Sequence, residues 1–142
     1  MNRPFKPFRS KVEAFQRRMP VYWCLQCDRP AGLPKGKAMH CSNCGSKAHY
    51  FPSTGEHRRY AHLRMLEACG EITGLKLQPT FPVEIHGQRL CVYRGDFEYV
   101  DRNGRRVIED YKASRDHTDD ASALRRRAAE LTYAINVTLV EA

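Results

Sequence analysis

Hydrophobic residues recur at helical and strand spacing from residue 51 to the end of the chain. Ser53 followed by Glu56 is a capping-box pattern, which predicts a helix that runs to about Cys69 and is stopped by Gly70. Helical spacing then places one set of side chains on a single face of this helix: Glu56, Tyr60, Leu63 and Leu66. The pattern therefore directs one carboxylate, that of Glu56, along the buried face.

Three strands are expected after this helix, over residues of about 74–85, 90–100 and 105–112. Pro79 and Pro82 interrupt the first strand, which favours an edge position or a bulge. The second and third strands are joined by a short turn at Asn103 and Gly104, so they form a hairpin.

A second helix is predicted to be capped by Thr118, with Asp119 and Asp120 in the first turn, where carboxylates favour the helix dipole. Its expected inner face consists of Ala121, Leu124, Ala128, Leu131 and Ile135. Residues 137–140 are expected to form a last strand. The order α-β-β-β-α-β predicts a mixed α and β core.

The first fifty residues differ in composition from this regular region. Residues 1–20 are basic and contain three prolines, so we expect an irregular arm, with a short helix over about 10–18 compatible with its sequence. Residues 21–50 carry four cysteines, with prolines and glycines between them. We therefore divide the chain into a basic arm (1–20), a cysteine module (21–50) and a core (51–142).

The chain of 142 residues has a formal net charge of +8 and a pI near 9.4. Basic residues cluster in the arm, at Arg58 and Arg59, and at 125–127, which suits a polyanion such as DNA, although a merely soluble basic surface is the alternative. Arg58, Arg59, Arg125 and Arg126 are the candidate nucleic-acid contacts. No apolar run reaches the roughly 20 residues of a membrane span, and the N-terminus lacks the apolar segment of a signal peptide. We expect a cytoplasmic protein that does not bind membranes.

Four of the six cysteines form two Cys-x-x-Cys pairs: Cys24, Cys27, Cys41 and Cys44. Four thiolates at this spacing predict a closed, tetrahedral zinc site with a structural role, while a redox dithiol and an iron–sulfur cluster are the alternatives. The other two cysteines, Cys69 and Cys91, are expected to be buried, and His40 and His49 are expected on the surface.

Four aromatic residues flank this module: Tyr22, Trp23, Tyr50 and Phe51. They could stack on exposed bases, but packing in the core of a small metal module is the favoured interpretation.

Two acids on the predicted hairpin, Asp96 and Asp110, are candidate ligands of a hard cation. Which acid faces Asp96 depends on the turn, because side chains alternate along a strand. A two-residue turn would place Glu109 on the face of Asp96. A three-residue loop over 102–104, with a left-handed glycine, would instead place Asp110 and Lys112 there. We predict this loop, or a bulge with the same effect.

These groups match the needs of phosphodiester hydrolysis. Asp96 and Asp110, with the Tyr111 carbonyl as a third oxygen, would suit Mg²⁺ or Mn²⁺, which lowers the pKa of bound water and polarises the phosphoryl group. Lys112 could orient the water or stabilise the transition state, and Glu56 could complete the site. The alternative without a catalytic role is that Asp96 and Asp110 are solvated strand residues and that Glu56 only caps its helix.

The order helix-Glu, strand-Asp and Asp-x-Lys resembles the PD-(D/E)XK, or restriction-endonuclease-like, nuclease superfamily. The closer resemblance is to small phage-encoded proteins assigned to it. It covers about residues 51–141 and is carried by Phe51-x-Ser53-x-x-Glu56-x-x-Arg59-Tyr60, Leu66-Glu67, Gly70-Glu71-Ile72, Leu77-Gln78-Pro79, Tyr93-x-x-Asp96-Phe97 and Val107-Ile108-Glu109-Asp110-Tyr111-Lys112.

This resemblance implies metal-dependent DNA cleavage, with Glu56, Asp96, Asp110 and Lys112 as the active residues. Gly95 replaces the proline of the motif, and the cysteine module, interpreted as a zinc ribbon, is an addition that the core does not need. Glu13 lies in a second Phe-x-Ser-x-x-Glu pattern, but Glu56 is preferred because its copy runs directly into the predicted core.

The sequence therefore predicts a Mg²⁺-dependent endodeoxyribonuclease with a structural zinc. Branched or recombination-intermediate DNA is a candidate substrate, suggested by the resemblance. A homodimer is expected by analogy, because such enzymes often cut both strands by acting in pairs. Two other functions fit part of the pattern. One is a non-catalytic nucleic-acid-binding adaptor on a nuclease-like scaffold, and the other is a zinc-held module that binds another protein.

Overall fold

The computed structural model describes residues 19–36, 38–112 and 119–141 of the chain. It divides into two compact units, Met1–Arg58 and Arg59–Ala142, which we describe separately. Most of the predicted arm, with its short helix and Glu13, lies outside the described residues, as does Thr118.

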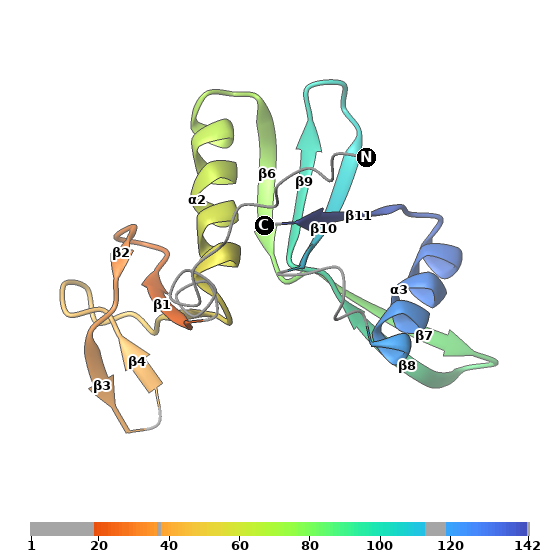
Figure 1. Ribbon diagram of the computed structural model, residues 1–142, viewed down its shortest axis with the longest axis horizontal. Helices are drawn as coiled ribbons and strands as arrows, with labels where there is room; N and C mark the ends of the chain where they lie inside the picture. The colour runs from red at the N-terminus through yellow and green to blue at the C-terminus, as the bar shows by residue number, and fades with distance from the viewer. Residues whose placement is uncertain (1–18, 37, 113–118, 142) are drawn as a thin grey trace, which may run out of the picture. The chain divides into compact units, whose positions relative to one another are not determined.

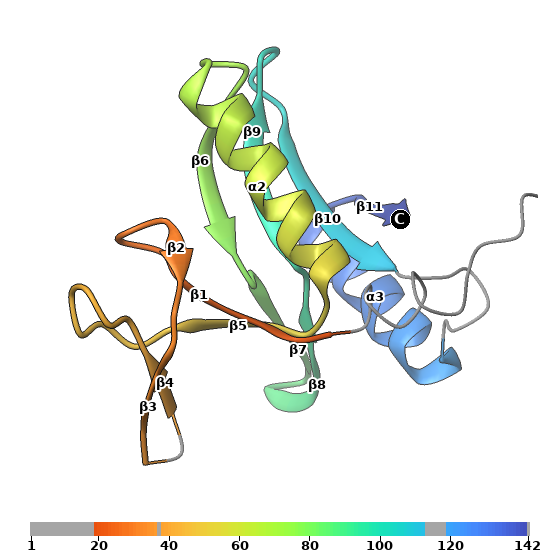
Figure 2. The same cartoon turned by 60° about the vertical axis from the view of Figure 1, so that its left-hand side comes forward.

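The N-terminal unit is built from short strands. Strands β1 (Val21–Cys24), β2 (Arg29–Pro30) and β5 (His49–Phe51) form an antiparallel sheet in the order β2-β1-β5 (Figure 2). Strands β3 (Leu33–Lys35) and β4 (Ala38–His40) form a separate antiparallel pair. With such short strands, the unit has little hydrophobic core apart from its aromatic rings.

Those rings form one cluster on one face of the sheet. The ring centroids of Trp23 and His57 are 4.2 Å apart, and those of Phe51 and His57 are 5.3 Å apart. Phe51 is fully buried, and the Trp23 indole N–H donates to Asp28 at 3.0 Å. Aromatic packing therefore takes the place of an aliphatic core here.

Helix α2 (Thr54–Ala68) has the predicted bounds. Its N-terminus is capped by the Ser53 hydroxyl, which accepts the Glu56 N–H at 3.1 Å, and the chain leaves the helix through Gly70 at φ 75°. Tyr60 and Leu63 are buried, as the helical spacing predicted. Leu66 is only half-buried.

A four-stranded mixed sheet organises the C-terminal unit. Its order is β11-β10-β9-β6, formed by β11 (Val137–Glu141), β10 (Arg106–Lys112), β9 (Phe97–Asp101) and β6 (Ile72–Leu77). Strands β10 and β11 are parallel, and the other neighbours are antiparallel. Strand β6 is an edge strand with a register shift between Thr73 and Lys76, so the predicted edge position is confirmed.

The two strands predicted over 74–85 and 90–100 are each broken in the middle. Beyond the break they continue as β7 (Thr80–Ile85) and β8 (Gln88–Arg94), which form a separate antiparallel pair. Figures 1 and 2 show this pair bending away from the four-stranded sheet. The register is continuous through the bend, because Leu77 pairs with Phe97 and Thr80 pairs with Arg94. The prediction of two unbroken strands was wrong, and the structure is one long hairpin with a corner.

Two residues with special backbone requirements make the corner. Gln78 is left-handed, with φ of 50°, and its N–H donates to the Asp96 carbonyl at 2.9 Å. Gly95 donates to the Pro79 carbonyl at 3.0 Å, and a Cβ atom on it would lie 3.2 Å from Ile108 Cγ2. Close packing at Gly95 therefore brings the corner against β10 and places Asp96 beside it.

Helix α3 (Asp120–Tyr133) packs over β7 and β8 (Figure 2). Its N-cap is Asp119, whose carboxylate accepts the Ala121 N–H at 3.3 Å, so the prediction of Thr118 as the cap was wrong by one residue. The core beneath it comprises Phe81, Val83, Tyr93, Ile108 and Ala129, with Ala128 and Ile135 packed against it.

The predicted inner face of α3 was wrong for three residues, since Ala121, Leu124 and Leu131 are all exposed, the two leucines at 71% and 68%. The helix approaches the sheet through Ala129, which is fully buried, because a small side chain allows the closest approach of backbone to strand. The large leucines consequently lie on the outside.

The described residues thus form a mixed α+β fold, in which five strands, and not the three expected, lie between the two helices and one strand follows α3. Within 19–36, 38–112 and 119–141, neither helix is long and apolar enough to cross a bilayer.

Candidate functional site

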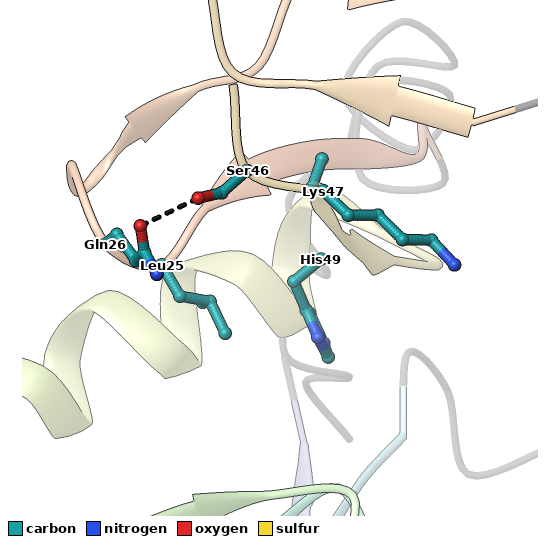
Figure 3. Close-up of a pocket in the computed structure, with 6 residues that line it drawn as sticks. Leu25, Gln26, Ser46, Lys47 and His49 are labelled. Carbon is teal, nitrogen blue, oxygen red and sulfur yellow. Dashed lines mark hydrogen bonds between the residues drawn. The ribbon is translucent and has the colours of Figure 1, made fainter. Parts of the chain in front are cut away.

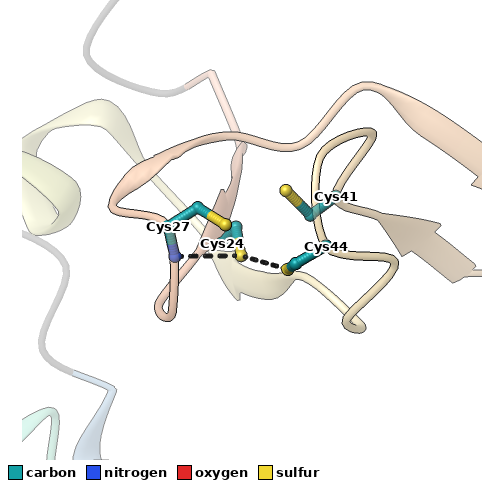
Figure 4. Close-up of side chains that lie close together, drawn as sticks. All are labelled: Cys24, Cys27, Cys41 and Cys44. Carbon is teal, nitrogen blue, oxygen red and sulfur yellow. Dashed lines mark hydrogen bonds between the residues drawn. The ribbon is translucent and has the colours of Figure 1, made fainter.

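The four cysteines of the two predicted pairs come together in the N-terminal unit (Figure 4). Their sulfur atoms all lie within 4.8 Å of one another, and the Cys24 and Cys44 sulfurs are 3.5 Å apart. Tetrahedral zinc–thiolate bonds of about 2.3 Å would set the sulfurs about 3.8 Å apart. The quartet therefore has the ligands and dimensions to hold a metal ion such as zinc.

Each cysteine pair is shaped by a local knuckle. In the first, the Cys27 N–H points at the Cys24 sulfur at 3.4 Å. In the second, the Gly45 N–H donates to the Cys41 carbonyl at 2.9 Å, with Gly45 left-handed at φ 74°. Such N–H groups stabilise thiolates, which are the form that binds a metal.

Two thiol groups already show this stabilisation. Hydrogen bonds from the Ser46 hydroxyl and N–H lower the pKa of Cys44 to about 6. The N–H of Cys44 lowers the pKa of Cys41. Deprotonation near neutral pH would assist metal binding, because the bound form of cysteine is the thiolate.

A pocket of about 340 Å³ lies beside the two knuckles (Figure 3). Leu25 and Gln26 from the first knuckle line one side, and Ser46, Lys47, Ala48 and His49 line the other. The Ser46 hydroxyl donates to the Gln26 side-chain oxygen at 2.7 Å across it. This bond links the two halves of the cysteine site at its edge.

The predicted three-residue loop is present in the β9–β10 hairpin. The Asp101 N–H donates to the Arg105 carbonyl at 2.9 Å, so residues 102–104 form the loop. Gly104 is left-handed, with φ of 74°. Phe97 therefore pairs with Glu109, and the Asp96 N–H donates to the Glu109 carbonyl at 2.9 Å. The Asp96 and Asp110 carboxylates are close enough to hydrogen-bond to each other, so the prediction that they share a face is confirmed.

The acids share their surroundings with Lys112 and a buried tyrosine. Lys112 Nζ lies 3.2 Å from Asp110 Oδ1, and the Tyr93 hydroxyl donates to Asp110 Oδ2 at 3.3 Å. The Tyr111 N–H donates to Asp96 Oδ2 at 2.6 Å. Because the N–H and C=O of one strand residue point to the same neighbouring strand, the Tyr111 carbonyl is directed toward the side of Asp96.

The acidic pair is electrostatically unusual. Burial raises the pKa of Asp96 to about 7, the Tyr111 N–H opposes the rise, and neighbouring Asp110 adds to it. Burial and the charge of Asp110 also raise the pKa of Tyr93, so its hydroxyl stays protonated and can donate. A cation that replaced the shared proton would relieve the repulsion between the two carboxylates.

On the opposite face of β10 lies an ion pair that the sequence did not predict. Glu109 is 2% exposed, and its carboxylate accepts two bonds from Arg59, at 2.6 and 2.8 Å, and one from the Tyr99 hydroxyl at 2.6 Å. The signal available in the sequence was the alternation of Glu109 with Asp110. The pair attaches α2 to the strand that carries Asp110 and Lys112.

The remaining predicted site residues lie in different places. Arg59 is engaged with Glu109 inside the unit, so its geometry is that of an internal ion pair and not of a phosphate contact. Arg58 and Arg125 are exposed, and Arg126 is half-buried. Glu56 is buried and belongs to the N-terminal unit, so its convergence with the acidic pair stays a prediction.

Three predictions about other side chains need correction. Cys69 is exposed, because it follows the last turn of α2, and Cys91 is only half-buried. His40 and His49 are half-buried, and each has one ring nitrogen buried without a hydrogen-bond partner. Of the four flanking aromatics, Phe51 is buried and Trp23 half-buried within the aromatic cluster, whereas Tyr22 and Tyr50 are exposed.

Comparison of the chain with protein-family models, with curated proteins and with solved structures found no match in any of the three.

Proposed function

We propose that this protein is a metal-dependent endodeoxyribonuclease with a restriction-endonuclease-like core and a structural zinc site. One observation carries the proposal: Asp96, Asp110 and Lys112 lie together at the hairpin corner, and the pKa of Asp96 is raised to about 7. A pair of carboxylates beside a lysine, one of them with a perturbed pKa, is typical of catalytic sites that bind a hard cation.

The two carboxylates, with the Tyr111 carbonyl, would hold Mg²⁺ or Mn²⁺. When bound, such an ion lowers the pKa of a water ligand and polarises the phosphoryl oxygen. Asp96 would release its proton as the site fills. In hydrolysis the water oxygen bonds to phosphorus, a bridging phosphorus–oxygen bond breaks, and the leaving oxygen takes a proton.

Lys112 is placed for two roles in this reaction. Its ammonium group lies 3.2 Å from Asp110, so it is held at the edge of the proposed metal site. From there it can donate to the attacking water or to a phosphoryl oxygen that gains charge in the transition state. Glu56, from the first turn of α2, is proposed as a further acid of the site.

DNA is the proposed substrate because of the charge of the chain. The net charge is +8, and six basic residues against one acid occupy positions 1–18.

Selectivity for branched DNA is a further proposal, which comes from the family resemblance. We also propose that the protein acts in the cytoplasm, which is the cytoplasm of the host if the chain is phage-encoded. A homodimer is proposed because Leu124 and Leu131 present an apolar stripe on the outside of α3.

Cleavage assays on supercoiled, single-stranded and branched DNA test this function, with Mg²⁺, Mn²⁺ or EDTA. We expect cleavage with either metal and a loss of roughly 10²–10³-fold in Asp110→Ala, the scale of losing one transition-state contact. Glu84→Ala is the matched control, because Glu84 is an exposed acid on β7. DNA binding without cleavage of any substrate would favour the non-catalytic adaptor instead.

A further inference from the structure

The β1–β5 ladder of the N-terminal unit has two unlike faces. Alternation places Trp23, His49 and Phe51 on one face, and they join the aromatic cluster with His57. On the other face Tyr22 and Tyr50 are directly opposite each other, with ring centroids 5.3 Å apart. They are 39% and 47% exposed, so a large part of each side chain is left open to solvent.

We propose that the Tyr22–Tyr50 face is a stacking platform for the unpaired bases of single-stranded DNA. Two neighbouring aromatic rings on an open sheet face offer flat apolar surface to successive bases, whatever their sequence. The tilt of 55° between the rings presents one ring face and one edge, which suits bases that are splayed apart on the strand. In duplex DNA the bases are stacked on each other and are not available to such a platform.

Charge favours a nucleic acid over a protein as the occupant. Arg29 on β2 is exposed, and the register sets it opposite Cys24, on the strand that carries Tyr22. The basic segment 1–18, with six lysines and arginines and one glutamate, ends a few residues before Tyr22 in the sequence. Aromatic rings joined to a strongly basic segment match a polymer of bases and phosphates.

The platform goes beyond the proposed cleavage, because it would select DNA with a single-stranded part and would do so without catalysis. Binding is therefore measured on the full-length chain carrying Asp110→Ala, in buffer with zinc and without Mg²⁺. A failure of the nuclease proposal does not alter this assay. The probe is a fluorescent oligothymidine of about 16 nucleotides, the upper end of typical site sizes, followed by anisotropy.

Tyr22→Leu and Tyr50→Leu should each weaken binding of oligothymidine by about 5- to 150-fold, the range for losing one stacked base. Tyr22→Phe and Tyr50→Phe keep the rings and should retain binding within about twofold. The slope of log affinity against log salt should stay unchanged in all four variants, because no phosphate contact is removed. A duplex of equal length should bind equally well to the leucine variants and to their parent.

A second measurement needs no variant at the platform. Nitration by tetranitromethane, located by peptide mass spectrometry, should be suppressed at Tyr22 and Tyr50 by saturating oligothymidine. Tyr133, 42% exposed in the other unit, is the internal control and should stay reactive. Four results would each overturn the platform. They are an affinity for oligothymidine in the leucine variants equal to that of the parent, an equal loss of affinity for duplex DNA, a preference for RNA of the same length, and nitration of Tyr22 and Tyr50 that oligothymidine does not suppress.

Discussion

The cysteine quartet and the acidic pair both gather groups that bind cations, but they depend on different lengths of chain. Each cysteine pair spans only four residues, and the groups that lower the pKa of Cys41 and Cys44 come from Cys44 and Ser46, in or just after the second pair. The acidic pair depends on the register of a long bent hairpin, on its turn and on its corner. A metal site of local origin can therefore be recognised from spacing alone, whereas a site of non-local origin requires the register to be known.

The largest effect should follow from breaking the local site. Cys41→Ser with Cys44→Ser removes two of four ligands and should abolish zinc binding, which in small zinc modules contributes about 10–16 kcal/mol of apparent folding free energy. Zinc content per chain and the NMR spectrum should show the N-terminal unit unfolded. Cys69→Ser is the control, since Cys69 is exposed and lies outside the quartet. Retention of one zinc by the double variant would contradict the quartet.

A smaller but still large effect is expected from the ion pair behind the acidic strand. Arg59→Met leaves the carboxylate of Glu109 buried without its cation, and breaking such a pair costs about 3–5 kcal/mol. Lys76→Met is the matched control, because Lys76 is 70% exposed and 3.9 Å from Glu98, and should cost about 0–1 kcal/mol. Urea unfolding measures both. An equal cost for the two variants would show that the Arg59 pair does not hold α2 to β10.

The corner of the hairpin is the next point to disturb. Gly95→Ala places a Cβ atom 3.2 Å from Ile108 Cγ2 and 3.4 Å from Pro79 Cγ. Such overpacking should cost about 1–3 kcal/mol in urea unfolding and should displace Asp96, lowering cleavage more than DNA binding. Gly32→Ala is the control, since a Cβ there has nothing within 4 Å. Unchanged stability and cleavage in Gly95→Ala would mean that the corner is not tightly packed.

The smallest effect on stability tests the electrostatics of the acidic pair. The pKa of Asp96 is raised to about 7 in the folded chain, so the unfolded chain loses this proton at lower pH than the folded chain does. The stability that Asp96 contributes is therefore full below about pH 4 and is lost as the pH rises through about 7. Asp96→Asn removes the buried charge and should raise the melting temperature by a few degrees near pH 8, and by less near pH 5.5.

The same variant should abolish cleavage, because an amide is a poor ligand of a hard cation. Asp120→Asn, an exposed acid in the first turn of α3, is the control and should show no gain that grows with pH. A gain of equal size at both pH values would contradict the raised pKa.

Features that depend on a few neighbouring residues were predictable from the sequence. Ser53, Gly70 and Gly104 mark the bounds of α2 and the hairpin loop, because capping and left-handed turns have strong residue preferences. The register of Asp96 and Asp110 followed from the loop. Chemistry and spacing also identified the cysteine quartet.

The corner had only a weak signal, the interruption at Pro79, which predicted an edge position or a bulge and not a bend. Gln78 adopts a left-handed conformation without being a glycine, and the alternation of residues on either side of Gly95 continues unbroken through the bend. Helix α3 was misassigned for a related reason, since its periodicity does not reveal that contact is made through Ala129 and not through Leu124 or Leu131. Tertiary packing decided these features, and single-residue preferences do not encode it.

In the β9–β10 hairpin, the face on which each β10 side chain lies depends on the length of the three-residue loop at 102–104. Each residue added to or removed from the loop shifts the pairing by one position, and side chains alternate with a period of two. An odd change in loop length would therefore turn Glu109 toward Asp96 and turn Asp110 and Lys112 away, while an even change would restore the original arrangement. The length of this exposed turn therefore decides which acids face each other across the hairpin.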